Sequence, residues 1–86
     1  MNRSLAVALQ YDKSVVPVPR VVAKGRGEVG EAILALAREH GVPIEANAPL
    51  AEALSQVELG EDIPEALYRA VAEVLIFILR ASGKIR

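Results

Sequence analysis

Cysteine is absent from this 86-residue sequence, and histidine occurs only once. A disulfide framework and thiol redox chemistry are therefore excluded, and a closed zinc site is not expected, because structural zinc normally takes four Cys or His ligands. Aromatic residues make up only 3% of the chain, so its core must be built mainly from Ala, Val, Leu and Ile. We expect a protein with no metal and no cofactor.

An excess of charge of either sign is also missing. Ten Lys and Arg residues stand against eleven Asp and Glu residues, so the net charge is −1, and general binding to nucleic acid is not expected. The longest apolar run, residues 74–79, is far shorter than the roughly 20 residues that span a bilayer, and the first residues do not form a secretory signal. We therefore expect a cytoplasmic protein that does not insert into a membrane.

The length and the hydrophobic patterning predict one small α+β domain over residues 1–86. Residues 5–11 alternate between apolar and smaller or polar side chains, which predicts a strand, and residues 20–24 predict a second one. Residues 12–19 contain two prolines and are expected to connect these strands. Residues 44–46 predict a short third strand.

Three helices are expected between and after these strands. The first covers about residues 28–40 and ends at Gly41 in a left-handed cap, because apolar residues recur there at helical spacing. The second covers about residues 49–56 with Asn47 as its N-cap, and the third runs from a capping box at Asp62 to about residue 80. The predicted order is β-β-α-β-α-α, a small mixed β-sheet surrounded by helices.

One glycine pattern has a functional interpretation. Gly25, Gly27 and Gly30 form G-x-G-x-x-G between a predicted strand and a predicted helix, and Glu45 follows where a dinucleotide fold places its ribose-binding acid. In the structural alternative, Gly25 and Gly27 make a turn and Gly30 has no ligand. Nucleotide binding is therefore one alternative function, and the chain is short for a complete dinucleotide fold.

Two apolar segments form a candidate partner-binding patch. Residues 15–19 must either cover an edge of the core, which is the default expectation, or stay exposed. The last helix continues its apolar surface around a second side, so it is either sandwiched or available to another protein. The predicted patch for docking a peptide consists of Val18, Pro19, Ala72, Leu75 and Ile76.

Several blocks, read in order, carry a family resemblance: residues 5–12 (LAVALQYD), 19–25 (PRVVAKG), 40–44 (HGVPI), 49–51 (PLA) and 63–75 (IPEALYRAVAEVL). Over nearly the whole chain the sequence resembles the cytoplasmic domain of the FlhB/YscU/SpaS family of flagellar and type III export proteins. The resemblance implies a small sheet surrounded by helices. It also implies a role in protein export and in the substrate-specificity switch, and it implies no nucleotide function for the glycine pattern.

The sequence departs from that family at the self-cleavage motif Asn-Pro-Thr-His, where the aligned residues are Met1 to Ser4. Cleavage requires an Asn that expels a following Pro nitrogen, but Asn2 precedes Arg3 and Asn47 precedes Ala48. We therefore expect no autocleavage and no enzyme activity. The membrane part and the strand before the cut are also absent, so the chain resembles a free-standing version of the fragment after cleavage.

The resemblance implies a soluble component that binds export substrates, export-apparatus proteins or a truncated membrane homologue at the cytoplasmic face of the export gate. If the preceding strand is missing, residues 5–11 should have one unpaired edge that such a homologue could fill by strand addition. A small nucleotide-binding protein and an oligomerising scaffold that uses the last helix remain the alternatives.

Overall fold

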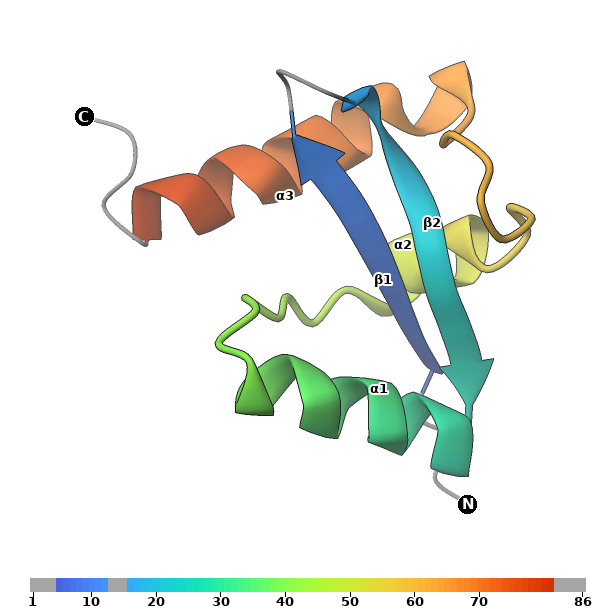
Figure 1. Cartoon of the computed structure of the whole chain (residues 1–86). Helices are drawn as coiled ribbons and strands as arrows, with labels where there is room; N and C mark the ends of the chain where they lie inside the picture. Colours follow the sequence, from blue (N-terminus) through green and yellow to red (C-terminus); the bar gives the residue numbers. More distant parts are fainter. Residues whose placement is uncertain (1–4, 13–15, 82–86) are drawn as a thin grey trace.

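The computed structural model describes residues 5–12 and 16–81. Within these residues, two strands and three α-helices make an α+β domain, as the sequence predicts (Figure 1). Their order is β1 (Leu5–Asp12), β2 (Val16–Arg26), α1 (Glu28–Glu39), α2 (Ala48–Leu54), a 3-10 turn η1 (Glu65–Leu67) and α3 (Tyr68–Ala81). No helix in the described ranges is long and apolar enough to cross a membrane.

The two strands are antiparallel, and β2 is longer than predicted. Leu5 pairs with Arg26 and Ala8 with Ala23, and the register shifts after Ala8 and again after Gln10. The prediction that the connection extends to residue 19 is wrong, because β2 begins at Val16 and contains both prolines. Proline cannot donate to a regular ladder, so a strand accepts it where the pairing is irregular, and the second register shift lies opposite these prolines.

A segment from late in the chain occupies the other edge of β2. The Gly60 and Val21 amides donate to the Val21 and Glu61 carbonyls at 2.7 and 3.0 Å, and the Ile63 amide donates to the Pro19 carbonyl at 2.9 Å. The predicted third strand is therefore wrong, since residues 44–46 are irregular and exposed. Pro43 removes one donor beside that segment, and both edges of β2 are already paired.

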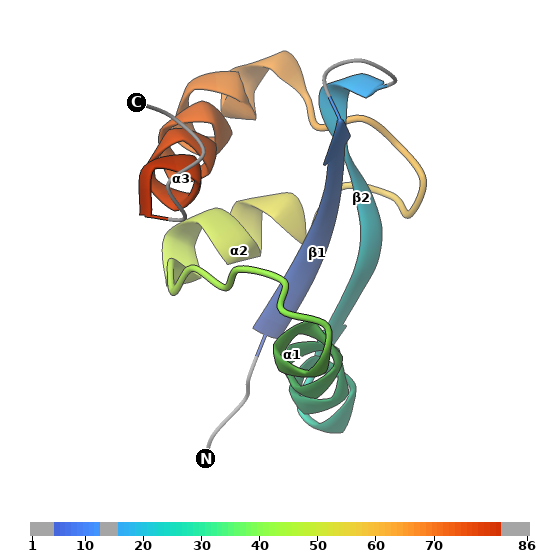
Figure 2. The ribbon, with the colours of Figure 1, turned by 60° about the vertical axis from the view of Figure 1, so that its left-hand side comes forward.

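The core lies between β2 and the last two helices. Its buried residues are Val21, Leu54, Ile63 and Val71. Figure 2 shows α2 and α3 on one side of the strands and α1 at the end where β2 finishes. Val7 and Leu9 pack against this core, in agreement with the predicted buried face of the first strand.

The helix ends follow local sequence signals in two places and fail to do so in a third. Gly41 has a φ of 69°, and the Gly41 and Val42 amides return to the Arg38 and Ala37 carbonyls, which confirms the predicted left-handed cap. The Asn47 side chain accepts a hydrogen bond from the Leu50 amide at 3.1 Å, as an N-cap should.

The predicted capping box at Asp62 is wrong. The Asp62 carboxylate accepts from Arg20 Nε at 3.2 Å instead of capping a helix. The chain then passes through Pro64 in extended geometry and η1 before α3 begins at Tyr68. The backbone pairing of Arg20 with Asp62 places the two side chains together, so tertiary contact decides the role of this carboxylate.

A candidate docking groove

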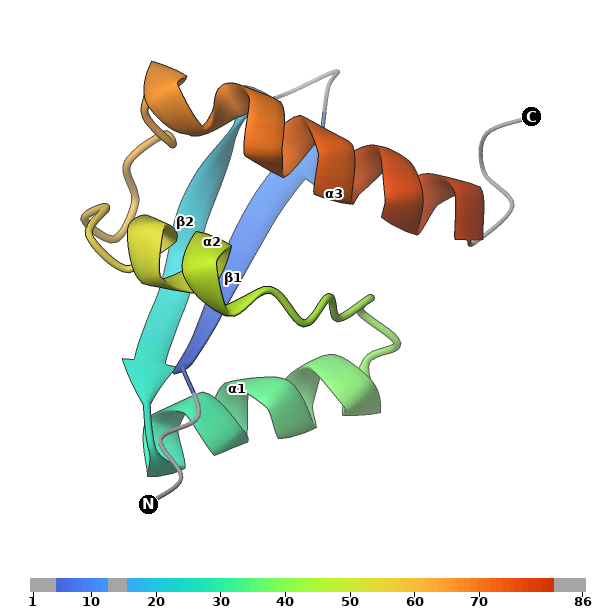
Figure 3. The same cartoon turned by 180° about the vertical axis from the view of Figure 1, so that it is seen from behind.

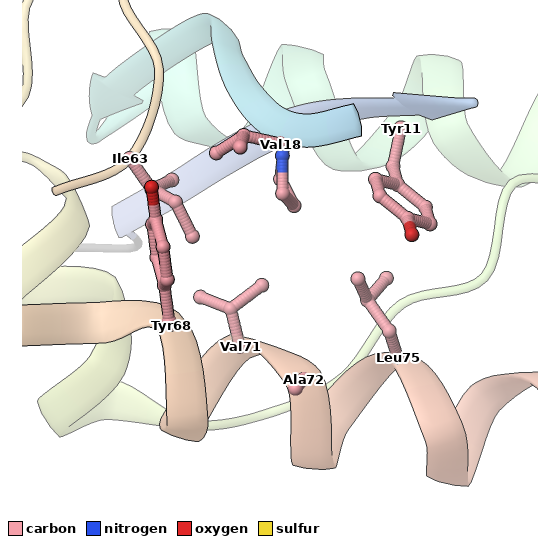
Figure 4. A pocket seen from close by; sticks show the side chains of 8 residues that line it. Tyr11, Val18, Ile63, Tyr68, Val71, Ala72 and Leu75 are labelled. Atoms are coloured by element: carbon pink, nitrogen blue, oxygen red, sulfur yellow. The ribbon is translucent and has the colours of Figure 1, made fainter. Parts of the chain in front are cut away.

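An apolar groove of about 200 Å³ separates the start of β2 from α3 (Figure 4). Figure 4 shows side chains from the strands above and from α3 below pointing toward a common space, with Tyr11 and Tyr68 at its two ends. We call this the α3 groove; it is lined by Tyr11, Val18, Pro19, Ile63, Tyr68, Val71, Ala72 and Leu75.

The structure brings together four of the five residues predicted for a docking patch. Val18 and Pro19 come from β2, while Ala72 and Leu75 come from α3, one turn apart on the side that faces β2. Val18 is half-buried and Pro19 is buried, so the default expectation of burial holds for these two residues. Val15 lies outside the described residues.

Ile76 is the predicted residue that does not line the α3 groove. It follows Leu75 directly, and adjacent helical residues point about 100° apart, which places Ile76 farther around the helix from the groove than Ala72. Ile76 is 44% exposed on the outer side of α3. The prediction merged two distinct sides of one helix.

Sequence reasoning missed the other four lining residues: Tyr11, Ile63, Tyr68 and Val71. The spacing of residues along α3 could have indicated Tyr68 and Val71. Together with Ala72 and Leu75 they follow the spacing i, i+3, i+4, i+7 of one helix face. Tyr11 and Ile63 carried no such signal, since only the folded chain brings the end of β1 and the segment before η1 to the same place.

The chemistry of the α3 groove is that of an apolar cavity with polar ends. Among the described residues, no charged side chain lines it, and the two tyrosines are the only lining side chains with polar atoms. A tyrosine presents an apolar ring and a hydroxyl that can donate or accept a hydrogen bond. The groove can therefore hold an apolar side chain and hydrogen-bond to polar atoms at either end.

The glycine pattern has a packing role. A Cβ added at Gly25 would lie 2.7 Å from the Val29 Cβ, so only glycine lets α1 approach the end of β2. Gly27 has a φ of 61°, which favours glycine at the turn. The dinucleotide interpretation is not supported, because it needs a parallel sheet with Glu45 on a strand, whereas the described strands are antiparallel and Glu45 is in an irregular segment.

The outer edge of β1 agrees with the expected unpaired edge. In the described ranges the sheet contains β1 and β2 alone, and β1 pairs only with β2. The residues aligned with the cleavage motif, Met1 to Ser4, lie outside the described residues.

Comparison with known proteins gives consistent matches over most of the chain. The family model described as the FlhB HrpN YscU SpaS family matches residues 3–78. The protein YlqH of Bacillus subtilis is 40% identical over 81 residues, which cover 94% of this chain and 87% of YlqH. The flagellar biosynthetic protein FlhB of Salmonella typhimurium is 47% identical over 74 residues, which cover 85% of this chain but only 19% of that FlhB.

The fold matches as well as the sequence does. The crystal structure of the cytoplasmic domain of FlhB from Shewanella putrefaciens superposes with a TM-score of 0.86 at 39% identity, covering 96% of this chain and 68% of that one. The fold, the extent of the matches along the chain and the family model agree, and this chain belongs to the FlhB HrpN YscU SpaS family.

Proposed function

We propose that this chain is a binding module of the type III or flagellar protein export apparatus, and that its α3 groove docks an apolar segment of an export substrate or a gate protein. Family membership supports the export role. The observation that carries the docking proposal is the α3 groove itself, an open apolar site that no charged side chain of the described residues lines, built by β1, β2, the segment before η1 and α3.

The dimensions of the groove define the segment that fits. A volume of about 200 Å³ is below the roughly 300–1,000 Å³ of small-molecule pockets. Such a site accepts one or two apolar side chains of a peptide, with backbone polar atoms left near the tyrosines. The proposed occupant is therefore a short peptide segment with an apolar anchor.

The proposed activity is binding without autocleavage. The described asparagine, Asn47, precedes Ala48 and uses its side-chain oxygen to cap α2. The next residue is Ala48, so the peptide bond after Asn47 has no proline nitrogen to expel. We further propose that the chain works at the cytoplasmic face of the export gate and takes part in substrate specificity, by analogy with the cytoplasmic domain that it matches.

A truncated membrane homologue is a second proposed partner, and it would use a different surface. The outer edge of β1 carries backbone groups that can accept another strand. Strand addition there is compatible with simultaneous occupation of the α3 groove only if Tyr11, which belongs to both β1 and the groove lining, keeps its position.

The test of the groove uses two alanines on the same helix. Ala72 lines the groove and is exposed, so Ala72→Glu places a charge in the groove without removing a core contact, while Ala70→Glu is the matched control at an exposed position that does not line it. Binding of short apolar segments of export substrates is measured by fluorescence polarisation. We expect Ala72→Glu to weaken binding at least about tenfold, because an ionised carboxylate in an apolar site is strongly disfavoured.

Circular dichroism must show that both variants fold. Equal binding by wild type, Ala72→Glu and Ala70→Glu would reject the α3 groove as the docking site. Absence of binding by the wild-type chain to segments of any export substrate would reject the proposed substrate role.

A further inference from the structure

The outer side of α3 exposes apolar residues that do not pack in the core. Residues 74–79 are six consecutive apolar residues. Successive side chains of a helix point about 100° apart, so these six side chains point to all sides of α3. Val71 and Leu75 turn toward the core, while Phe77 is 61% exposed and Ile76 is 44% exposed. The C-terminal half of α3 also extends past the strands (Figures 1 and 3).

These two residues form the centre of a stripe with charged ends. Glu73, Ile76, Phe77 and Arg80 follow the spacing i, i+3, i+4, i+7 and are all exposed. We call these four residues the outer stripe. Glu73 and Arg80 are two helical turns apart, about 10.5 Å along the axis, too far for an ion pair with each other. In the described part of the chain, neither forms a salt bridge.

We propose that two copies of this chain associate through the outer stripe, with their α3 helices antiparallel about a two-fold axis. Centring the pair between residues 76 and 77 places Ile76 of one copy against Phe77 of the other. The same symmetry places each Glu73 against Arg80 of the other copy, so both charges gain a partner of opposite sign.

Charge complementarity selects the antiparallel arrangement. In a parallel pair the two Glu73 side chains would face each other, as would the two Arg80 side chains, and like charges disfavour that pairing. An isologous two-fold interface is also the commonest solution for identical subunits. One sequence thus supplies both halves of a self-complementary surface.

The expected dimer is weak and independent of the α3 groove. A 14-residue helix is about 21 Å long, and one of its faces buries less than the roughly 800 Å² per partner of a standard interface. Arg80 lies half a turn around the helix from Val71, so the outer stripe faces away from the core. Failure of substrate docking would therefore leave this proposal standing, and the reverse also holds.

Sedimentation equilibrium at low ionic strength tests the association between about 10 μM and 1 mM, the range in which a small interface should half-dimerise. We expect the mass to rise from 9.2 kDa toward twice that value. Phe77→Asp should stay monomeric throughout. Leu36→Asp, which changes an equally apolar and 55% exposed residue on α1, is the matched control and should dimerise as wild type does.

A charge exchange tests the antiparallel register. Glu73→Arg alone and Arg80→Glu alone each replace two attractive pairs by two repulsive ones, so each should weaken association about tenfold at low salt. The double variant restores both pairs with reversed sign and should return to within about threefold of wild type.

Circular dichroism checks that every variant folds. A wild-type chain that stays at 9.2 kDa over the whole range overturns the proposal. Dimers that survive Phe77→Asp place the interface elsewhere and also overturn it. A double variant that is no better than the single ones rejects the antiparallel pairing.

Discussion

Lys24 and Arg26, two residues apart on β2, both reach across to α2. The Lys24 ammonium donates to the Ser55 and Val57 carbonyls at 2.9 and 2.7 Å, just beyond the C-terminal end of the helix. The Arg26 guanidinium makes two parallel bonds to the Glu52 carboxylate at 3.0 and 2.9 Å. A helix of seven residues is too short to be stable alone, so these side chains help to hold α2 on the sheet.

The Arg26–Glu52 pair predicts a pH dependence. Hydrogen bonds from Arg26 lower the pKa of Glu52 below its ordinary value of 4.5. A carboxyl group with a lowered pKa stabilises the fold above the pKa of the unfolded chain and loses that contribution as the pH falls through the folded-state pKa. We expect carboxyl NMR titration to show Glu52 titrating below 4.5.

Glu52→Gln is the matching variant. Below pH 4.5, the free energy of unfolding of this variant should fall less on acidification than that of the wild type. Urea unfolding at several pH values measures both. Because both side chains are exposed, the effect should be small and should shrink in high salt. A Glu52 that titrates at or above 4.5 would contradict the assignment.

The success of prediction varied with the type of secondary structure. The sequence predicted α1, α2 and α3 to within a few residues at most ends, because the apolar spacing and caps such as Gly41 and Asn47 act locally. It failed for residues 44–46, because a run of three residues does not show whether a strand lies beside it, and in the fold this segment is exposed and pairs with neither strand. It failed for the start of β2 because two prolines fit only where the register shifts.

The candidate site shows the same division between local and long-range information. Val18, Pro19, Ala72 and Leu75 could be grouped from their apolar character, and the structure places all four around the α3 groove. Ile63 joins the groove through a backbone bond to Pro19, which no sequence pattern encodes. Long-range pairing therefore set the part of the site that the sequence could not predict.

The outer edge of β1 is the element that should respond to a second strand. We expect a peptide from a membrane homologue, ending in the Asn before its cleavage site, to protect some amides among residues 5–11 from hydrogen exchange. Only alternate amides should respond, because successive amides of a strand point to opposite edges and the others already bond to β2. The same peptide with its sequence scrambled is the control.

The pattern of protection distinguishes the outcomes. Protection of alternate residues indicates strand addition at this edge. Uniform protection of the chain would indicate general stabilisation, and no protection at peptide concentrations near 1 mM, where millimolar binding would be visible, would count against the second proposed partner.

The whole molecule is organised around one side chain of β2. Val21 is fully buried, with an exposed fraction of 0%, and its backbone bonds to residues 60 and 61 while its side chain joins the cluster with Leu54, Ile63 and Val71. The strands, α2 and α3 therefore share one core, and we expect them to unfold together.

Val21→Ala should destabilise the whole domain by about 2 to 3 kcal/mol, because it removes two buried methyl groups and leaves a cavity. For a chain of this size the melting temperature should fall by about 8 to 20 °C. Val22→Ala is the matched control at the next residue, which is 48% exposed, and should change stability much less. Calorimetry measures both, and two separate transitions would contradict the single shared core.

The bonds between β2 and the segment before η1 also mean that the α3 groove forms only after residues beyond α2 have been synthesised. Arg20 and Asp62 meet across 42 residues of sequence, and the groove combines residues from β1, β2 and α3. A nascent chain that has emerged only as far as α2 contains three of the eight lining residues and no opposite wall. The groove is therefore a late product of synthesis, and a ligand that recognises it distinguishes finished molecules from incomplete ones.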